Sequence, residues 1–209
     1  MRVAALVGIA TATVALVGLL ALALDQPVAF LTRDPPAAVR DGACSTECFY
    51  AGLLSNLGVL VYAGGASVCL FVLFVLPADR SPQRRTIAWG AVLLVVLLTD
   101  DMFGLHDHLA PSYVPRGEQV VQVAIGAAAL LYVIGFRQRL VDSGLAALVV
   151  VAGAMYAVST GSDAARLGGH LLEDGSKFVG IVSLSALLIA LAVQELKQEL
   201  EVALEGKTM

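Results

Sequence analysis

The chain alternates between long uncharged runs and short polar segments. Six of the runs approach bilayer length, because a spanning helix needs about 20 mostly apolar residues. Only helices and closed barrels satisfy the backbone inside a bilayer, and the alternating pattern of barrel strands is missing from the sequence. We therefore predict an all-α, polytopic membrane protein with six transmembrane helices in one domain, residues 1–209. The predicted spans are 3–24, 49–76, 86–105, 119–136, 143–162 and 178–194, with an outer loop at 25–48.

The third span differs from the others because it ends in acidic residues. Its uncharged run, Thr86 to Thr99, is too short to cross about 30 Å of hydrocarbon at about 1.5 Å per residue. The helix must therefore continue to Leu105. This places Asp100 and Asp101 inside the membrane or at its edge, where ionisable groups usually mark a site.

Helical spacing predicts which polar side chains of "TDDMFGLHDH" share a face. Residues seven apart nearly eclipse on a helix. A continuous helix would align Asp101 with His108, and Asp100 with Asp107, while His106 would point elsewhere. We expect these groups to form one wall of a polar chamber.

Composition and charge support the membrane assignment and give an orientation. The chain is 58% hydrophobic and only 14% charged, whereas soluble domains carry about 25% charged residues. Lys and Arg cluster in "ADRSPQRRT" and "RQRLVD", so the positive-inside rule places these loops and both termini in the cytoplasm. We predict a multi-pass protein of the cell (inner) membrane with its acidic side outward. The sequence has no basic patch for nucleic acid. Its first apolar run could be a cleaved signal peptide, but we favour a retained helix because the run is longer than the apolar part of a signal peptide.

The three cysteines have separate interpretations. Cys44 and Cys48 lie in the predicted outer loop, where a disulfide can form. Their spacing also permits metal ligation, but we favour the disulfide. Cys69 lies within the second span and is interpreted as a small buried hydrophobic residue.

A second polar group precedes the last span. His170, Glu173, Asp174 and Lys177 share one helical face if this segment is helical. Imidazole and carboxylate together suit zinc or another divalent transition metal. The predicted metal ligands are His106, His108, His170, Glu173 and Asp174. The alternative is a metal-free ion-pair network in which Lys177 neutralises carboxylates and ties the helices together.

Three short patches resemble the alkaline ceramidase-like membrane hydrolases. Ser55 in "LLSN", Asp100 and Asp101 in "LLTDD", and His170 carry this resemblance. It implies a zinc-dependent enzyme that hydrolyses a lipid amide or ester, with either aspartate as catalytic general base and Ser55 beside the oxyanion. The family has seven spans against the six predicted, and Asp174 stands where that family has a second histidine.

Two further functions fit the same residues. A non-catalytic membrane subunit or assembly factor would use the polar cluster structurally and bind a membrane protein partner. A small cation or proton transporter would use it as part of an ion path. The predicted partners are the lipid bilayer together with either a lipid substrate or a protein.

Overall fold

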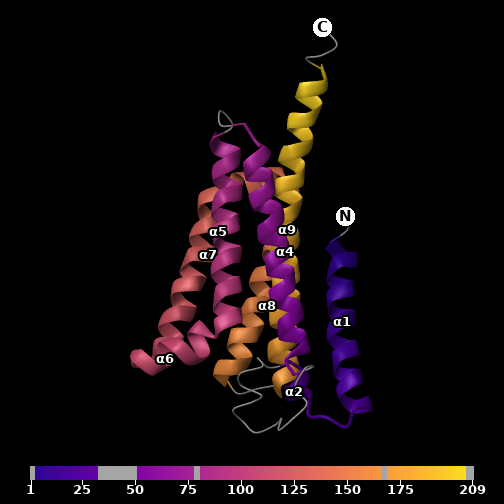
Figure 1. The fold of residues 1–209 in the computed structure, drawn as a ribbon, viewed down its shortest axis with the longest axis vertical. Helices are drawn as coiled ribbons and strands as arrows, with labels where there is room; N and C mark the ends of the chain where they lie inside the picture. Colours follow the sequence, from indigo (N-terminus) through magenta and orange to yellow (C-terminus); the bar gives the residue numbers. More distant parts are fainter. Residues whose placement is uncertain (1–2, 33–50, 78–80, 166–168, 206–209) are drawn as a thin grey trace. The chain divides into compact units, whose positions relative to one another are not determined.

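The computed structural model describes residues 3–32, 51–77, 81–165 and 169–205, and every regular element in these ranges is a helix (Figure 1). In chain order the elements are α1 (Val3–Ala23), α2 (Val28–Thr32), α4 (Leu53–Val75), α5 (Ser81–Phe103), the π-helix η1 (Leu105–Leu109), α6 (Ala110–Tyr113), α7 (Gly117–Asp142), α8 (Ala146–Ala165) and α9 (Gly169–Glu205). The all-α prediction is therefore confirmed for the described part of the chain. The predicted disulfide between Cys44 and Cys48 lies outside the described residues.

In the described part of the chain, five helices are long and apolar enough to cross a membrane. They are α1, α4, α5 from Pro82, α7 and α9. The fifth predicted span corresponds to α8, whose apolar part, Ala146–Ser162, is shorter. Helices of this length and hydropathy are typical of a multi-pass membrane protein.

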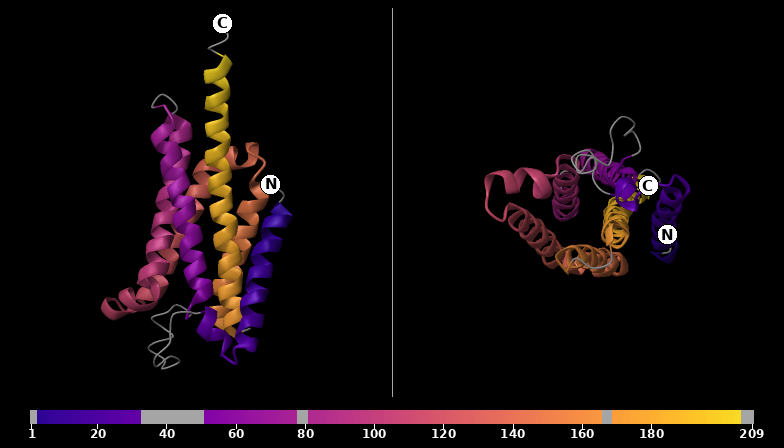
Figure 2. Two further views of the ribbon diagram at one scale, coloured as in Figure 1. Left: turned by 45° about the vertical axis from the view of Figure 1, so that its right-hand side comes forward. Right: turned by 90° about the horizontal axis from the view of Figure 1, so that it is seen from below.

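Helix α9 differs most from its predicted span of 178–194. It begins at Gly169, where φ is +65°, and runs without a break to Glu205 (Figure 2). Glycine adopts positive φ without the steric cost that a Cβ imposes, so the chain enters the helix there. The polar residues before the apolar run and the acidic segment after it are therefore helical as well.

The contacts between helices divide the chain into two compact units. Unit one comprises Met1–Val61 and Ala147–Leu184, and unit two comprises Tyr62–Ala146 and Ser185–Met209. The boundary falls within α4 and within α9, so each of these helices contributes one part to each unit.

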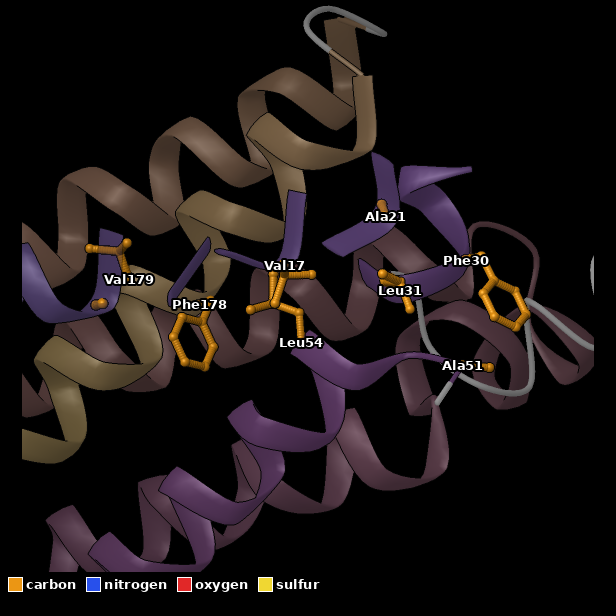
Figure 3. Close-up of a cluster of buried hydrophobic side chains, with 9 residues drawn as sticks. Val17, Ala21, Phe30, Leu31, Ala51, Leu54, Phe178 and Val179 are labelled. Atoms are coloured by element: carbon orange, nitrogen blue, oxygen red, sulfur yellow. The ribbon is translucent and has the colours of Figure 1, made fainter. Parts of the chain in front are cut away.

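Unit one has a core of small and large apolar side chains (Figure 3). The buried members are Ala10, Val17, Ala21, Phe30, Leu31, Ala51, Leu54, Phe178 and Val179. They come from α1, α2, the first turn of α4, the residues just before it, and α9. These side chains join the start of the chain to the first part of α9, which carries the second polar group.

Glycines allow close helix packing in unit one. A Cβ on Gly175 would lie 2.7 Å from a methyl carbon of Val14, and a Cβ on Gly58 would lie 2.9 Å from Ile181. Membrane helices have little hydrophobic force between them and rely on such small residues for van der Waals contact. The glycines near the second polar group are therefore explained by packing.

In unit two, η1 and α6 connect α5 to α7 (Figure 1). The π-helix η1 contacts both α5 and α7, and α6 contacts α7. A Cβ on Gly117 would lie 2.3 Å from the backbone of Ala110, so only glycine fits this contact between α7 and α6. The rings of Tyr132 and Phe136 on α7 lie 5.1 Å apart. The segment formed by η1 and α6 therefore keeps the end of α5 beside the start of α7.

Large apolar side chains lie exposed along the spans. Phe74, Leu131 and Trp89 are 91%, 69% and 58% exposed. A soluble protein rarely exposes such surfaces, whereas a bilayer covers them at no cost. The exposed side chains therefore agree with the membrane assignment.

Candidate functional site

The acidic end of α5 is shaped by a break in the helix. Gly104 has φ +56° and ψ +47°, a left-handed conformation that ends α5 at Phe103. The chain then forms the π-helix η1 and enters α6, which has Pro111 in its first turn. Proline is accepted there because the first-turn N–H has no helical partner to lose. The helix thus ends two residues before the predicted end near Leu105, and the continuous helix through to His108 is wrong.

This break turns His106 back toward Asp100. One carboxylate oxygen of Asp100 accepts the backbone N–H of His106 at 3.0 Å, and the other lies 2.7 Å from Nδ1 of the same residue. An ionised carboxylate can only accept hydrogen bonds, so Nδ1 is the donor. As a whole residue, Asp100 is only 5% exposed. Its two hydrogen bonds fix both the start of η1 and the direction of the imidazole.

The other ring nitrogen of His106 faces a second carboxylate. Nε2 lies 3.3 Å from an oxygen of Asp107. His106 therefore stands between two acids and can carry a proton on either nitrogen or on both. The side chains of Asp100, His106 and Asp107 are 8%, 13% and 38% exposed, so this acid–base chain runs from the interior to the surface.

The predicted geometry is therefore corrected for His106, which does not point away from the acidic residues. His108 instead places its ring against Gly104, where a Cβ would lie 2.8 Å from the imidazole. Asp101 and His108 are both half-buried and both make further interactions. The continuous helical spacing that predicted their alignment is interrupted between them at Gly104.

The second polar group is helical as predicted. His170 is exposed at the start of α9, while Glu173, Asp174 and Lys177 are half-buried and have interaction partners. Ser55 lies on α4 in unit one and is also half-buried. The predicted site residues thus fall into two sets: Ser55, His170, Glu173 and Asp174 in unit one, and Asp100, Asp101, His106 and His108 in unit two.

The predicted metal ligands do not form a recognisable cage. Among the described residues, no group of three or more His, Cys, Asp or Glu side chains is arranged to hold a metal ion. Within unit two, the contact atoms of His106 and Asp107 provide only a pair. Zinc binding therefore stays a prediction.

Comparison with known proteins places the chain in a family. Residues 4–191 match a family model described as Domain of unknown function (DUF8692). The chain belongs to this family. No curated protein and no solved structure matches it. The resemblance to alkaline ceramidases is not tested by these comparisons and stays a prediction.

The DUF8692 match covers both polar groups and ends before the acidic segment of α9. That segment contains an ion pair that the sequence pattern does not predict. Arg139 Nη1 on α7 donates to Glu195 Oε1 on α9 at 2.6 Å. The two residues are far apart in the sequence, and only helix packing brings them together. Arg84 similarly donates to the backbone oxygen of Leu73 at 2.7 Å and caps the end of α4.

Proposed function

We propose that this DUF8692 protein is a multi-pass membrane protein that takes up and passes on protons through Asp100, His106 and Asp107. The contact of both ring nitrogens of His106 with carboxylates carries this proposal. Imidazole changes charge near neutral pH, so a proton can enter at one nitrogen and leave from the other. The carboxylates stabilise the imidazolium that forms in between.

The burial of the three side chains supports a direction for this transfer. Asp107 is accessible to water, whereas Asp100 is buried against the end of a predicted span. A proton arriving at Asp107 passes to Nε2 of His106 while Nδ1 gives its own proton to Asp100, and the cycle closes when Asp100 releases that proton and the imidazole returns to its starting tautomer.

We place this site on the extracytoplasmic side. Arg84 lies in the first turn of α5 and Asp100 in its last, while Arg139 lies in the last turn of α7. The arginines thus occupy the ends of these helices opposite to the acid–base chain. By the positive-inside rule the arginine end is cytoplasmic, which supports an outward site. Cytoplasmic termini and six spans complete this proposed topology.

A metal site is the second candidate, and one distance favours it. Nε2 of His106 and Oδ1 of Asp107 are 3.3 Å apart, a spacing that two ligands of one ion can have. Asp100 on Nδ1 would orient the imidazole, as carboxylates do behind metal-bound histidines. Zinc-dependent hydrolysis of a lipid amide or ester, with Ser55 taking part, extends this candidate. Docking of a partner protein at an ion-pair network is the remaining alternative.

Proton flux into vesicles tests the first proposal. The full chain is reconstituted with a pH-sensitive dye inside, and a pH gradient is imposed in the presence of a potassium ionophore. We expect wild type to collapse the gradient faster than empty vesicles, while His106→Gln and Asp107→Asn return to the rate of empty vesicles. Glu118→Gln is the matched control, because Glu118 lies in the first turn of α7, at the same end of the helices, and does not belong to the proposed Asp107–His106–Asp100 proton path. Equal rates for wild type and His106→Gln would contradict the proposal.

Elemental analysis of purified protein tests the second candidate. About one transition metal per chain, lost in His106→Gln and Asp107→Asn but kept in Glu118→Gln, would replace proton transfer by metal binding. Metal-free protein that still collapses the pH gradient would exclude metal as the basis of the activity. Stoichiometric co-purification of another protein, without flux or metal, would favour a subunit role.

A further inference from the structure

Two buried hydroxyl groups in unit two have no hydrogen-bond partner among the described residues. They are Oη of Tyr132 on α7 and Oγ of Ser185 on α9, and these residues are 6% and 1% exposed. Ser183, one of the neighbouring serines of α9, instead donates to the backbone oxygen of Val179 at 2.8 Å. A buried hydroxyl without a partner costs about 1–3 kcal/mol, and lipid around the bundle cannot supply one.

Glycines place both hydroxyls against neighbouring helices. A Cβ on Gly65 of α4 would lie 3.4 Å from Ser185 Oγ, and a Cβ on Gly90 of α5 would lie 3.3 Å from Tyr132 Oη. Leu188, one turn after Ser185 on α9, also lies against Gly90. The two hydroxyls are therefore separated by about one helical turn, roughly 5 Å along the bundle.

Cys69 adds a third polar atom at this level. Cys69 follows Gly65 by one turn on α4 and is 0% exposed. It is close enough to Tyr132 for the two side chains to interact electrostatically. A thiol is a weak donor and a weak acceptor. Tyr132, Ser185 and Cys69 thus form a neutral polar cluster among apolar side chains, and we call it the hydroxyl cluster.

We propose that the hydroxyl cluster binds water between α4, α5, α7 and α9. Water both donates and accepts, and buried water usually makes two to four hydrogen bonds to groups that would otherwise be unsatisfied. One molecule at about 2.8 Å from each can bridge two hydroxyls up to about 5 Å apart, and two molecules in a row can bridge a larger separation. The cluster carries no charge to compensate an ion in this apolar setting, so a neutral guest is required. This site is independent of the proposed proton transfer.

The free energy of unfolding in detergent provides the first test. If water bridges the cluster, Tyr132→Phe and Ser185→Ala each lower the folding equilibrium constant about fivefold, because each removes a hydrogen bond. The double variant then loses less than the product of the two effects, since both changes disturb the same water. Ser183→Ala is the control, because its hydroxyl has a partner within the helix. Single variants that are as stable as wild type, or more stable, would overturn the proposal.

Hydroxyl-radical labelling of the folded protein gives a second readout that does not depend on stability. Radicals generated from bound water modify the side chains that touch it. We expect labelling of Tyr132 and Cys69, while Tyr62, which is 1% exposed on α4, stays protected. The Ser185→Ala variant should label Tyr132 less than wild type does. Equal protection of Tyr132 and Tyr62 in wild type would show that no water is bound there.

Discussion

Two acid–base pairs in unit two have nearly the same length but different chemistry. Asp100 and His106 approach to 2.7 Å at the end of α5, and Arg139 and Glu195 approach to 2.6 Å where α7 meets α9. Arginine stays protonated at any physiological pH, so its pair can only hold helices together. Histidine changes charge near neutral pH. The difference teaches that contact distance does not separate a structural pair from a functional one, whereas the capacity to change charge does.

Removing the buried acid should have the largest effect. Asp100→Ala leaves the backbone N–H and Nδ1 of His106 without their acceptor, so we expect a loss of about 3 kcal/mol in the free energy of unfolding. Asp100→Asn keeps one acceptor oxygen and should lose less. Reversible unfolding in detergent measures both. Equal losses would mean that the charge or the second carboxylate oxygen of Asp100, which Asn also lacks, carries the whole stabilisation, because Asn keeps the volume of the side chain.

The left-handed glycine should come next. Gly104→Ala places a Cβ at φ +56° and 2.8 Å from the ring of His108, which we expect to cost about 1–2 kcal/mol. Because the same glycine turns His106 toward Asp100, proton flux should fall together with stability. Gly126→Ala on α7 is the control, since a Cβ there meets nothing within 4 Å. Full proton flux in Gly104→Ala would show that proton transfer does not depend on the left-handed turn at Gly104.

The arginine pair should contribute less. The side chains of Arg139 and Glu195 are 32% and 17% exposed, so solvent weakens their attraction. We expect Glu195→Gln to cost about 1 kcal/mol and to leave proton flux unchanged. A loss of flux in a variant that is still folded would give this pair a role beyond helix packing.

The smallest expected effect distinguishes the second carboxylate contact of His106 from the arginine pair by pH. The coupling energy between His106 and Asp107, measured by a double-mutant cycle of unfolding, should be a few tenths of a kcal/mol more favourable at about pH 5 than at about pH 8. At low pH Nε2 carries a proton toward Asp107, and at high pH its lone pair faces the carboxylate. The Arg139–Glu195 coupling should stay constant over this range. A pH-independent His106–Asp107 coupling would show that the imidazole does not change charge there.

Most of the helices could be predicted from the sequence because uncharged runs of bilayer length have few alternatives. The ends of the helices were harder to predict. The continuation of α9 past residue 194 is the exception, because Glu, Lys and Leu all favour helix and the composition of this segment indicates a helical continuation. The apolar part of α8 is shorter than its predicted span because the uncharged residues from Ser143 do not all belong to it. Ser143 caps the end of α7, and α8 begins only at Ala146.

The candidate site was predicted in composition but not in geometry. The short segment from Asp100 to His108 contains the contacting residues, and its density of ionisable groups at the end of an apolar run is what revealed it. The Asp100–His106 contact could not be predicted, because it depends on whether Gly104 takes a right- or left-handed conformation. A glycine adopts either one readily, so the decision comes from tertiary packing.

The length of α9 has a practical consequence for imaging this small protein. Its 37 residues extend about 55 Å, well beyond the roughly 30 Å of hydrocarbon that a spanning helix must cross. The segment from Lys197 to Glu205 is therefore a largely exposed helical rod whose backbone continues that of the span. A soluble carrier whose first helix is fused in register to this rod would inherit its orientation, and electron microscopy could then align particles on the carrier.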